Sequence, residues 1–492
     1  MILSLLLIIP MVGAILATLI PREREELSKW LALAVALLNL LVSLSLYVGF
    51  QAASGYQFEE FAAWIPSLNI NYHVGIDGLS LFLVLLTTFL SVIAIYSSWT
   101  AITKQVKEYM ALLLVLETAM LGVFVSLDLF LFYLFWEASL IPMALLIGQW
   151  GGERRVYASI KFIIYTMAGS ALMLVAALVL YFYAEPNTSD LPTLVANANL
   201  PANLQVWLFI AFALAFAVKT PLFPLHTWLP AAHVEAPTAG SIILAGVLLK
   251  MGTYGFLRFA IPLFPAAVPF WTPLMVGLAV IGILYGALVA LWQDDVKRLV
   301  AYSSVAHMGY IVLGIFSGGQ QGLSGAVLQM INHGLSTGML FFMVGVLYEQ
   351  RHTRLFKEYG GIWIKVPVFG VFFLLAVFSS VGLPGLNGFV GEFVILLGTF
   401  RVNWIAATLG TIGIVLAAWY LLVAVRKVMF GPFNPANEQL KDMNGREIVI
   451  ALALTIFFFV IGLYPNLLFD KINPATAELA DLINSTVLVA GR

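Results

Sequence analysis

The sequence predicts an all-α polytopic membrane protein of about 14 transmembrane helices, with two inverted five-helix repeats and broken helices at spans seven and twelve. Of its 492 residues, 62 % are hydrophobic and 10 % are charged, whereas about 25 % of a soluble domain is charged. Apolar runs of about 20 residues, the length that crosses a bilayer, recur along the whole chain. Two of these runs are too long for one straight helix and contain proline or glycine.

The apolar runs divide the chain into four parts. A three-helix segment (1–108) precedes a first five-helix repeat (109–258), a second, inverted repeat (270–428), and a final helix with a tail (447–492). The first run is longer than a signal-peptide core, so it is assigned as a span. The predicted spans are 2–20, 30–50, 76–98, 109–127, 128–149, 158–184, 205–232, 237–258, 270–292, 300–316, 323–348, 366–400, 404–428 and 447–468.

Basic residues alternate between the predicted loops. With the N-terminus outside, 18 of the 24 Lys and Arg residues fall on the inner side and four on the outer side. The remaining two, Lys219 and Lys250, lie inside spans. Because cytoplasmic loops carry the excess of Lys and Arg, both termini are expected outside.

The two long spans contain helix-breaking sequences. Span seven is interrupted at Lys219-Thr220-Pro221, and span twelve between Gly382 and Glu392. Proline removes a backbone donor and clashes with the preceding turn, and broken backbone is tolerated at membrane depth only beside protein or water. The breaks lie five spans apart, which reverses their direction and predicts inverted repeats whose broken helices mark an ion site.

Ionisable side chains lie inside the apolar spans, where an isolated charge is costly. Ion pairing or snorkelling that only fixes helix packing would explain one such group. Two acids, two lysines and two histidines on six different spans instead favour a proton path. The candidate residues are Glu137, Lys219, Lys250, His307, His333 and Glu392, with Glu117 as a further carboxylate.

These residue types suit proton transfer. Removal from water favours the neutral forms of both lysine and carboxylate, so a buried lysine can release its proton when a nearby carboxylate is withdrawn. Histidines and trapped water can pass protons between lysines. Moving one charge against 100 mV costs about 2.3 kcal/mol, and the sequence contains no motif for ATP or a redox centre, so this energy is expected from outside the chain.

Other chemistry receives less support from the sequence. The chain has no cysteine, which excludes thiolate-bound iron–sulfur clusters and disulfides. Gly385, Gly388 and Gly391 follow no strand, so they do not indicate a dinucleotide site. His226 and His233 lack a third ligand at fixed spacing, and they are expected to shape the broken helix rather than to bind a metal.

Two aspartates are interpreted as helix caps. Asp77 precedes span three and Asp128 lies at the turn between spans four and five. Aspartate favours helix starts, so neither is assigned to a substrate.

Several stretches resemble the antiporter-like subunits of respiratory complex I, and the resemblance covers nearly the whole chain. It implies a proton-pumping, non-redox subunit of a proton-translocating NADH:quinone oxidoreductase, with a polar axis formed by the Glu137–Lys219 pair, Lys250, His333 and Glu392. The stretches are Gly75-Ile76-Asp77-Gly78-Leu79-Ser80, Phe135-Trp136-Glu137, Ala217-Val218-Lys219-Thr220-Pro221, Ala236-Pro237-Thr238-Ala239-Gly240-Ser241 and Ser303-Ser304-Val305-Ala306-His307-Met308-Gly309.

The resemblance is to the M type of these subunits. The L and N types usually place lysine where this chain has Glu392, and the L type has a long lateral helix after its bundle. Implied partners are neighbouring L-type and N-type subunits, the lateral helix of the L type, and lipids, but no nucleic acid. No cofactor is expected on this chain; NADH, FMN, iron–sulfur clusters and quinone are implied in partner subunits, and the implied location is a bacterial inner membrane.

Alternatives remain at this point. D-type relatives fed by ferredoxin and plastoquinone share the glutamate of span twelve. A Na⁺/H⁺ antiporter subunit shares the same lysine machinery, and a scaffold with an inactive ion path is a third class.

Overall fold

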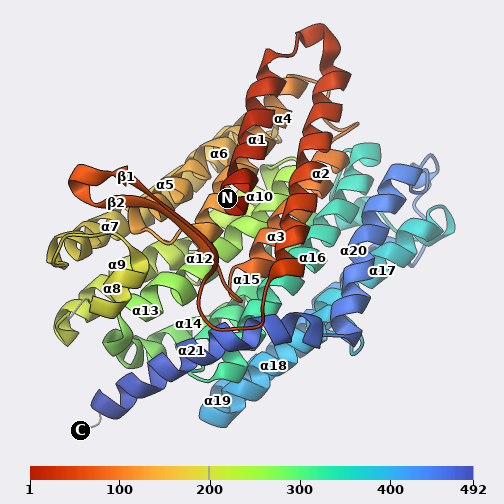
Figure 1. The fold of residues 1–492 in the computed structure, drawn as a ribbon. Helices are drawn as coiled ribbons and strands as arrows, with labels where there is room; N and C mark the ends of the chain where they lie inside the picture. The colour runs from red at the N-terminus through yellow and green to blue at the C-terminus, as the bar shows by residue number, and fades with distance from the viewer. Residues whose placement is uncertain (198–199, 491–492) are drawn as a thin grey trace.

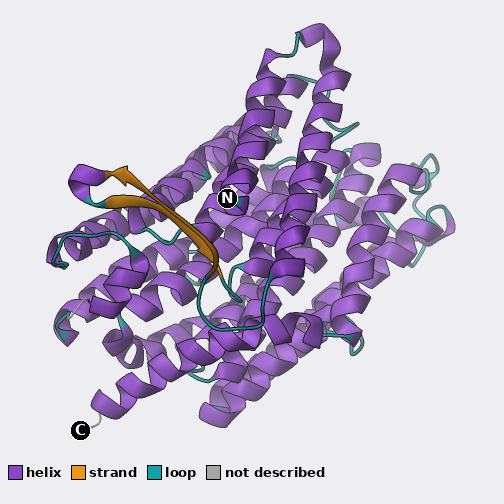
Figure 2. Cartoon of the chain, viewed as in Figure 1, coloured by secondary structure: helices purple, strands orange, loops and turns teal. Residues whose placement is uncertain are grey.

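The computed structural model describes residues 1–197 and 200–490, with side chains described up to residue 485. These residues form a bundle of helices with one two-stranded hairpin (Figures 1 and 2). Twelve helices in the described residues are long and apolar enough to cross a membrane, and Leu81–Ser97 and Pro367–Val381 are shorter apolar helices. They lie where spans were predicted; the exact number of spans and the inverted repeats stay predictions.

The first half of the chain forms α1 to α13 and the hairpin. The elements are α1 (Ile2–Leu19), α2 (Glu25–Gly49), β1 (Gln57–Ile65), β2 (Ile70–Ile76), α3 (Leu81–Ser97), α4 (Val106–Val125), α5 (Leu129–Ala138), α6 (Leu140–Trp150), α7 (Arg155–Tyr183), α8 (Leu191–Asn197), α9 (Ala202–Lys219), α10 (Trp228–Glu235), α11 (Thr238–Ile243), α12 (Leu249–Gly255) and α13 (Ile261–Leu263). Between α11 and α13 the helix continues through two π-helical segments, η3 (Leu244–Leu248) and η4 (Phe256–Ala260).

The second half forms α14 to α21. These helices are α14 (Val268–Leu291), α15 (Val296–Ile315), α16 (Gln320–Arg351), α17 (Pro367–Val381), α18 (Asn387–Val402), α19 (Trp404–Met429), α20 (Gly445–Leu463) and α21 (Asn466–Ala490). Short 3₁₀ turns occupy Arg22–Arg24, Pro66–Leu68, Pro265–Ala267, Phe356–Glu358, Ile362–Ile364 and Pro435–Asn437.

Both predicted breaks are confirmed. α9 ends at Lys219 and α10 begins at Trp228, while α17 ends at Val381 and α18 begins at Asn387. Gly382, with φ +81°, ends α17 in the left-handed conformation that glycine adopts without steric cost. The structure also breaks span five between Ala138 and Leu140, a feature the sequence analysis missed. Pro142 explains it, since proline cannot donate to the carbonyl four residues earlier, at Ala138.

The N-terminal part departs from the prediction in one place. Span three was placed at residues 76–98, but residues up to Ile76 form β2, and α3 begins at Leu81. β1 and β2 pair antiparallel, with Glu60 opposite Val74. β2 is buried along nearly its whole length, whereas β1 is mostly exposed. A short apolar run that is buried throughout did not distinguish the end of the strand from the start of a helix.

Caps fix several helix starts. The carboxylate of Asp128 accepts hydrogen bonds from the backbone N–H groups of Phe130 (2.9 Å) and Leu131 (3.1 Å), which confirms its predicted role. Asp77 accepts from Leu79 N and Ser80 N just before α3. Asp77 has a second role that was not predicted, an ion pair with Arg258 of η4. Arg258, assigned to an outer loop by the charge count, is instead buried there.

The polar spans lie at the centre of the bundle. The most apolar windows of Thr238–Leu263 and Gln320–Arg351 are 100 % buried, and that of Val296–Ile315 is 89 % buried, whereas the window of Ile2–Leu19 is only 39 % buried. These three central segments carry Lys250, His333 and His307. These three ionisable groups are thereby shielded from lipid by the surrounding helices.

The N-terminus, the hairpin and α21 lie on one face of the molecule. The terminal amine of Met1 pairs with Glu60 of β1 at 3.3 Å. Lys471 of α21 donates to the carbonyl of Phe50, at the end of α2 and just before the hairpin, at 2.6 Å. We call this the hairpin face. The 25 residues of α21 follow the last predicted span, where the sequence analysis assigned only a tail.

Candidate functional site

Four of the six predicted residues lie in one buried row, as two hydrogen-bonded pairs that face each other. Nζ of Lys250 lies 2.7 Å from Nδ1 of His333, and Oε1 of Glu392 lies 2.7 Å from Nδ1 of His307. The rings of His307 and His333 are 5.9 Å apart between centroids. The row therefore crosses from α12 through α16 and α15 to α18, with each histidine hydrogen-bonded to a group that can lose or gain a proton.

The Lys250 end of the row sits in irregular helix. The ammonium of Lys250 also donates to the carbonyl of Ala245, within η3. In a π-helical turn each carbonyl bonds five residues ahead rather than four, and such turns are frequent at functional sites. The eighth predicted span is therefore π-helical just before Lys250, and a second π-helical segment, η4, follows α12.

The Glu392 end of the row depends on the break in span twelve. Glu392 lies in the second turn of α18, and its Oε1 also accepts a hydrogen bond from Nε2 of Gln329 at 3.1 Å. Asn332, one turn along α16 from Gln329, donates to the carbonyl of Asn387 at 2.7 Å and so joins α16 to the first turn of α18 after the break. Gln329 and Asn332 were not predicted. Their signal was two amides one helical turn apart in a span that also carries the candidate His333.

Glu392 also reaches the lateral surface. It lines a cavity of about 670 Å³ between α18 and α19, together with Phe389, Phe393 and Thr411. Gly382, at the break, lies in the same wall, and a Cβ there would be 3.3 Å from Oε2 of Glu392. One carboxylate oxygen therefore faces the buried row and the other faces the break.

The other two predicted residues, Glu137 and Lys219, lie near each other but do not touch. In residues 1–197 and 200–490 no ion pair within 4.0 Å joins them. The ammonium of Lys219 is 3.4 Å from the hydroxyl of Ser139, at the break in span five, and 5.1 Å from the ring centroid of Trp136. Glu137 is half-buried, and it is close enough for a coulombic interaction with Lys219.

The helices that carry the two lysines are in close contact: α12 packs against the end of α9. A Cβ on Gly252, two residues after Lys250, would lie 2.3 Å from Oγ1 of Thr220 and 2.6 Å from the carbonyl of Phe216. Only glycine permits α12 to approach the break in span seven this closely. The buried hydroxyl of Thr220, the residue after Lys219 at the break, has no hydrogen-bond partner within the described part of the chain.

The remaining candidates lie outside the row. Glu117 accepts from Nδ2 of Asn39 on α2 at 2.7 Å. His226 stacks on Phe223, next to the span-seven break. His233 stacks on Phe341 of α16 with ring centroids 4.4 Å apart. Among the described residues, no group of three or more His, Cys, Asp or Glu side chains is placed to hold a metal ion.

The comparisons with known proteins agree with this arrangement. Residues 126–417 match the family described as NADH:quinone oxidoreductase/Mrp antiporter, TM. The chain is 47 % identical to NADH-quinone oxidoreductase subunit M of Rhodobacter capsulatus, over 97 % of this chain and 96 % of that protein. It is 42 % identical to NADH-ubiquinone oxidoreductase chain 4 of Marchantia polymorpha, over 97 % of this chain and 96 % of that protein.

Solved structures show the same fold. A chain of respiratory complex I from Thermus thermophilus with bound NADH matches with a TM-score of 0.90 and 33 % identity, covering 98 % of this chain and 100 % of that one. A chain of the Mrp complex from Dietzia sp. DQ12-45-1b matches with a TM-score of 0.82 and 21 % identity, covering 99 % and 55 %, which concerns the fold alone. The chain belongs to the NADH:quinone oxidoreductase/Mrp antiporter family, and within it to the antiporter-like M subunits of complex I.

Proposed function

We propose that the chain moves protons through the membrane along the axis Glu137, Lys219, Lys250, His333, His307 and Glu392. The observation that carries the proposal is the buried row in which Lys250, His333, His307 and Glu392 follow one another at 2.7 Å, 5.9 Å and 2.7 Å. Each member can take up or release a proton, and a histidine can accept at one ring nitrogen while it donates at the other.

The chemistry follows from exchange between charged and neutral partners. A protonated Lys250 can pass a proton to Nδ1 of His333, because they share one hydrogen bond. The Nε2 atoms of His333 and His307 have no protein partner among the described residues, so a water molecule between two such buried polar groups would complete the relay. His307 then delivers the proton to Glu392.

The ends of the axis lie on opposite sides of the bundle. In Figure 1, α5 and α18 flank the central helices α12, α15 and α16 from opposite sides. Glu137 is half-exposed at one end, and Glu392 borders a lateral cavity at the other. Charge at either edge can therefore act on a neighbouring membrane subunit. We propose that L-type and N-type subunits, with the lateral helix of the L type, cover these edges.

The energy would come from electron transfer in other subunits. The chain has no cysteine, and we assign NADH, FMN, iron–sulfur clusters and quinone to partners. We also propose a bacterial inner membrane with the hairpin face outward, since predicted loops on the other side hold 18 of the 24 Lys and Arg residues. A reporter fused after Arg492 should be active only outside the cytoplasm, and activity only inside would reverse the assignment.

The test of function is substitution within the purified complex in sealed vesicles. Glu137→Gln and His333→Gln should each leave assembly intact but nearly abolish NADH-driven acidification and the coupled quinone reduction. Near-normal pumping by both assembled variants would contradict the proposal. Sodium/proton exchange by the isolated chain in vesicles would instead identify a self-standing antiporter.

A further inference from the structure

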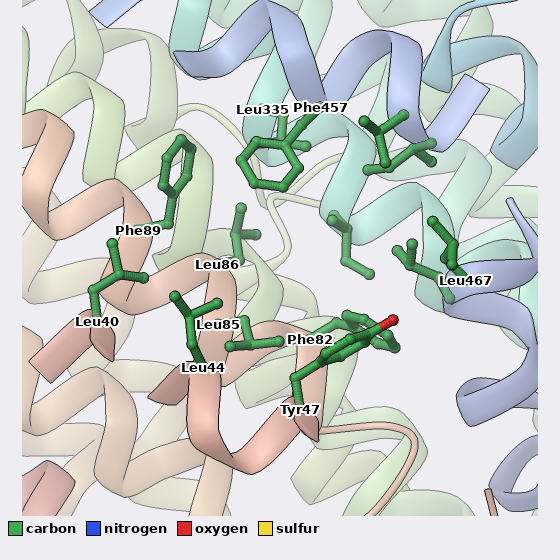
Figure 3. A pocket seen from close by; sticks show the side chains of 14 residues that line it. Leu40, Leu44, Tyr47, Phe82, Leu85, Leu86, Phe89, Leu335, Phe457 and Leu467 are labelled. Carbon is green, nitrogen blue, oxygen red and sulfur yellow. The ribbon is translucent and has the colours of Figure 1, made fainter. Parts of the chain in front are cut away.

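An apolar groove lies on the side of α16 that faces away from the proton axis. It has a volume of about 380 Å³ and is formed by α2, α3, α16, α20 and the start of α21. Figure 3 shows Leu40, Leu44 and Tyr47 of α2 on one wall and Phe457 of α20 opposite them, with Leu86 of α3 between. The full lining is Leu40, Leu44, Tyr47, Phe82, Leu85, Leu86, Phe89, Ile331, Leu335, Phe457, Val460, Ile461, Leu467 and Leu468. Apart from the hydroxyl of Tyr47, these side chains are apolar.

The groove has a closed end and a charged end. At the end near the middle of the spans, the rings of Phe89 and Phe457 meet edge to face with centroids 5.1 Å apart. At the hairpin face, the ammonium of Lys471 lies 4.8 Å from the ring centroid of Tyr47, in the groove wall. α21 begins at Asn466 beside this end, and the N-terminal end of a helix carries partial positive charge. One end of the groove is therefore apolar, and the other end, at the hairpin face, is positively charged.

Its length fits half of a bilayer. Leu40 and Tyr47 are seven residues apart on α2, which is about 10 Å along the helix. Half of the hydrocarbon core is about 15 Å thick. A chain that enters at the level of Lys471 would therefore end near the Phe89–Phe457 pair, inside one leaflet.

We propose that this groove is a binding site for one acyl chain of an anionic phospholipid, with the phosphate of its headgroup at Lys471. One bond of the ammonium goes to the carbonyl of Phe50. An ammonium has three donors, so two remain for phosphate oxygens. The half-exposed side chain of Lys471 leaves room for them. The charge and the apolar lining together select a lipid over a neutral transmembrane helix of a partner subunit, which would match the walls but not the cation.

The bound acyl chain would pack against the side of α16 opposite the proton axis. Ile331 and Leu335 line the groove, while His333, between them on α16, faces His307 and Lys250. Residues two apart on a helix lie on different faces. The lipid thus fills space on one side of α16 whose other side holds a proton carrier.

The site is tested with a photoreactive lipid in the intact purified complex. Phosphatidylglycerol that carries a diazirine near the end of one chain should label peptides that contain Leu86, Ile331 or Phe457. Leu44→Trp fills the groove and should reduce that labelling several-fold. Leu41→Trp is the matched control, because Leu41 is 65 % exposed on the same helix but does not line the groove, and it should label as the parent does.

The headgroup contact is tested separately. Lys471→Gln should weaken retention of phosphatidylglycerol about fivefold, which corresponds to the roughly 1 kcal/mol that one lysine contributes near anionic lipid. Lys441→Gln, an exposed lysine outside the groove, should leave retention unchanged. Equal labelling in Leu44→Trp and Leu41→Trp would overturn the acyl-chain site. Equal retention of phosphatidylglycerol and phosphatidylcholine by the parent would overturn the phosphate contact, and crosslinks from groove residues to another subunit would show a protein occupant instead.

Discussion

Substitution of Glu392 by glutamine separates the charge of this residue from its shape. The amide can still accept from Gln329 Nε2 (3.1 Å) and from Nδ1 of His307 (2.7 Å), so α16 and α18 should remain in place. A hydrogen bond to a charged group contributes about 1.5–3 kcal/mol and a neutral one about 0.5–1.5 kcal/mol. We therefore expect a loss of about 1–2 kcal/mol in stability and normal assembly.

The effect on proton transfer should be much larger. Glutamine cannot bind a proton, and an imidazolium at His307 would lose the carboxylate that compensates it. Leaving a buried charge without its partner costs about 3–5 kcal/mol. At 1.36 kcal/mol for each factor of ten, the low end predicts that translocation falls about a hundredfold.

The assay is NADH-driven acidification of vesicles that contain the purified variant complex, with quinone reduction measured in parallel. Glu153→Gln is the control, because Glu153 is an exposed loop carboxylate. Glu392→Lys should retain part of the activity, since an ammonium beside His307 would repeat the Lys250–His333 pair. Pumping within twofold of the parent in assembled Glu392→Gln would refute the reasoning and leave Glu392 as a packing residue.

Three further substitutions test the supports of the site. Gly252→Ala should lower the stability of the complex by about 1–3 kcal/mol, because the methyl group would overlap Thr220 and backbone at the span-seven break; an unchanged unfolding temperature would show that the helices can separate there at no cost. Arg258→Met should impair assembly because it leaves the buried carboxylate of Asp77 unpaired, and adding Asp77→Leu should restore part of the assembly; equal yields of the single and double variants would deny the coupling. Burial lowers the pKa of His73 in β2, but the hydrogen bonds and charge interactions with Asp190 and Glu59 outweigh this effect and raise the pKa above 6.5. The stabilisation is then complete below pH 6.5 and is lost as the pH rises through the raised pKa. The protection of hairpin amides from hydrogen exchange, measured relative to the intrinsic exchange rate at each pH, should therefore fall over this range in the parent but not in His73→Gln.

The sequence alone determined the class of the protein and the identity of its charged residues. Long apolar runs can satisfy their backbone in lipid only as helices, so composition and periodicity were sufficient to predict the membrane fold. The breaks at Lys219 and between Gly382 and Glu392 were also readable, because proline and a left-handed glycine act locally. The resemblance carried by short motifs identified the family that the comparisons show.

The pairing of the charged residues depends on how the helices pack. Glu392 meets His307 and Gln329, and Lys250 meets His333, across 85, 63 and 83 residues of chain. Such contacts depend on how helices rotate and tilt against one another, which the packing of their side chains sets and a single span cannot reveal. The resemblance implied a Glu137–Lys219 pair, and the structure adds that the Ser139 hydroxyl lies 3.4 Å from the Lys219 ammonium while Glu137 is near it without direct contact. The sequence analysis also assigned the residues of α21 to a tail. A helix with a polar face lacks the long apolar run that indicates a membrane span, so α21 is recognised only by what it packs against.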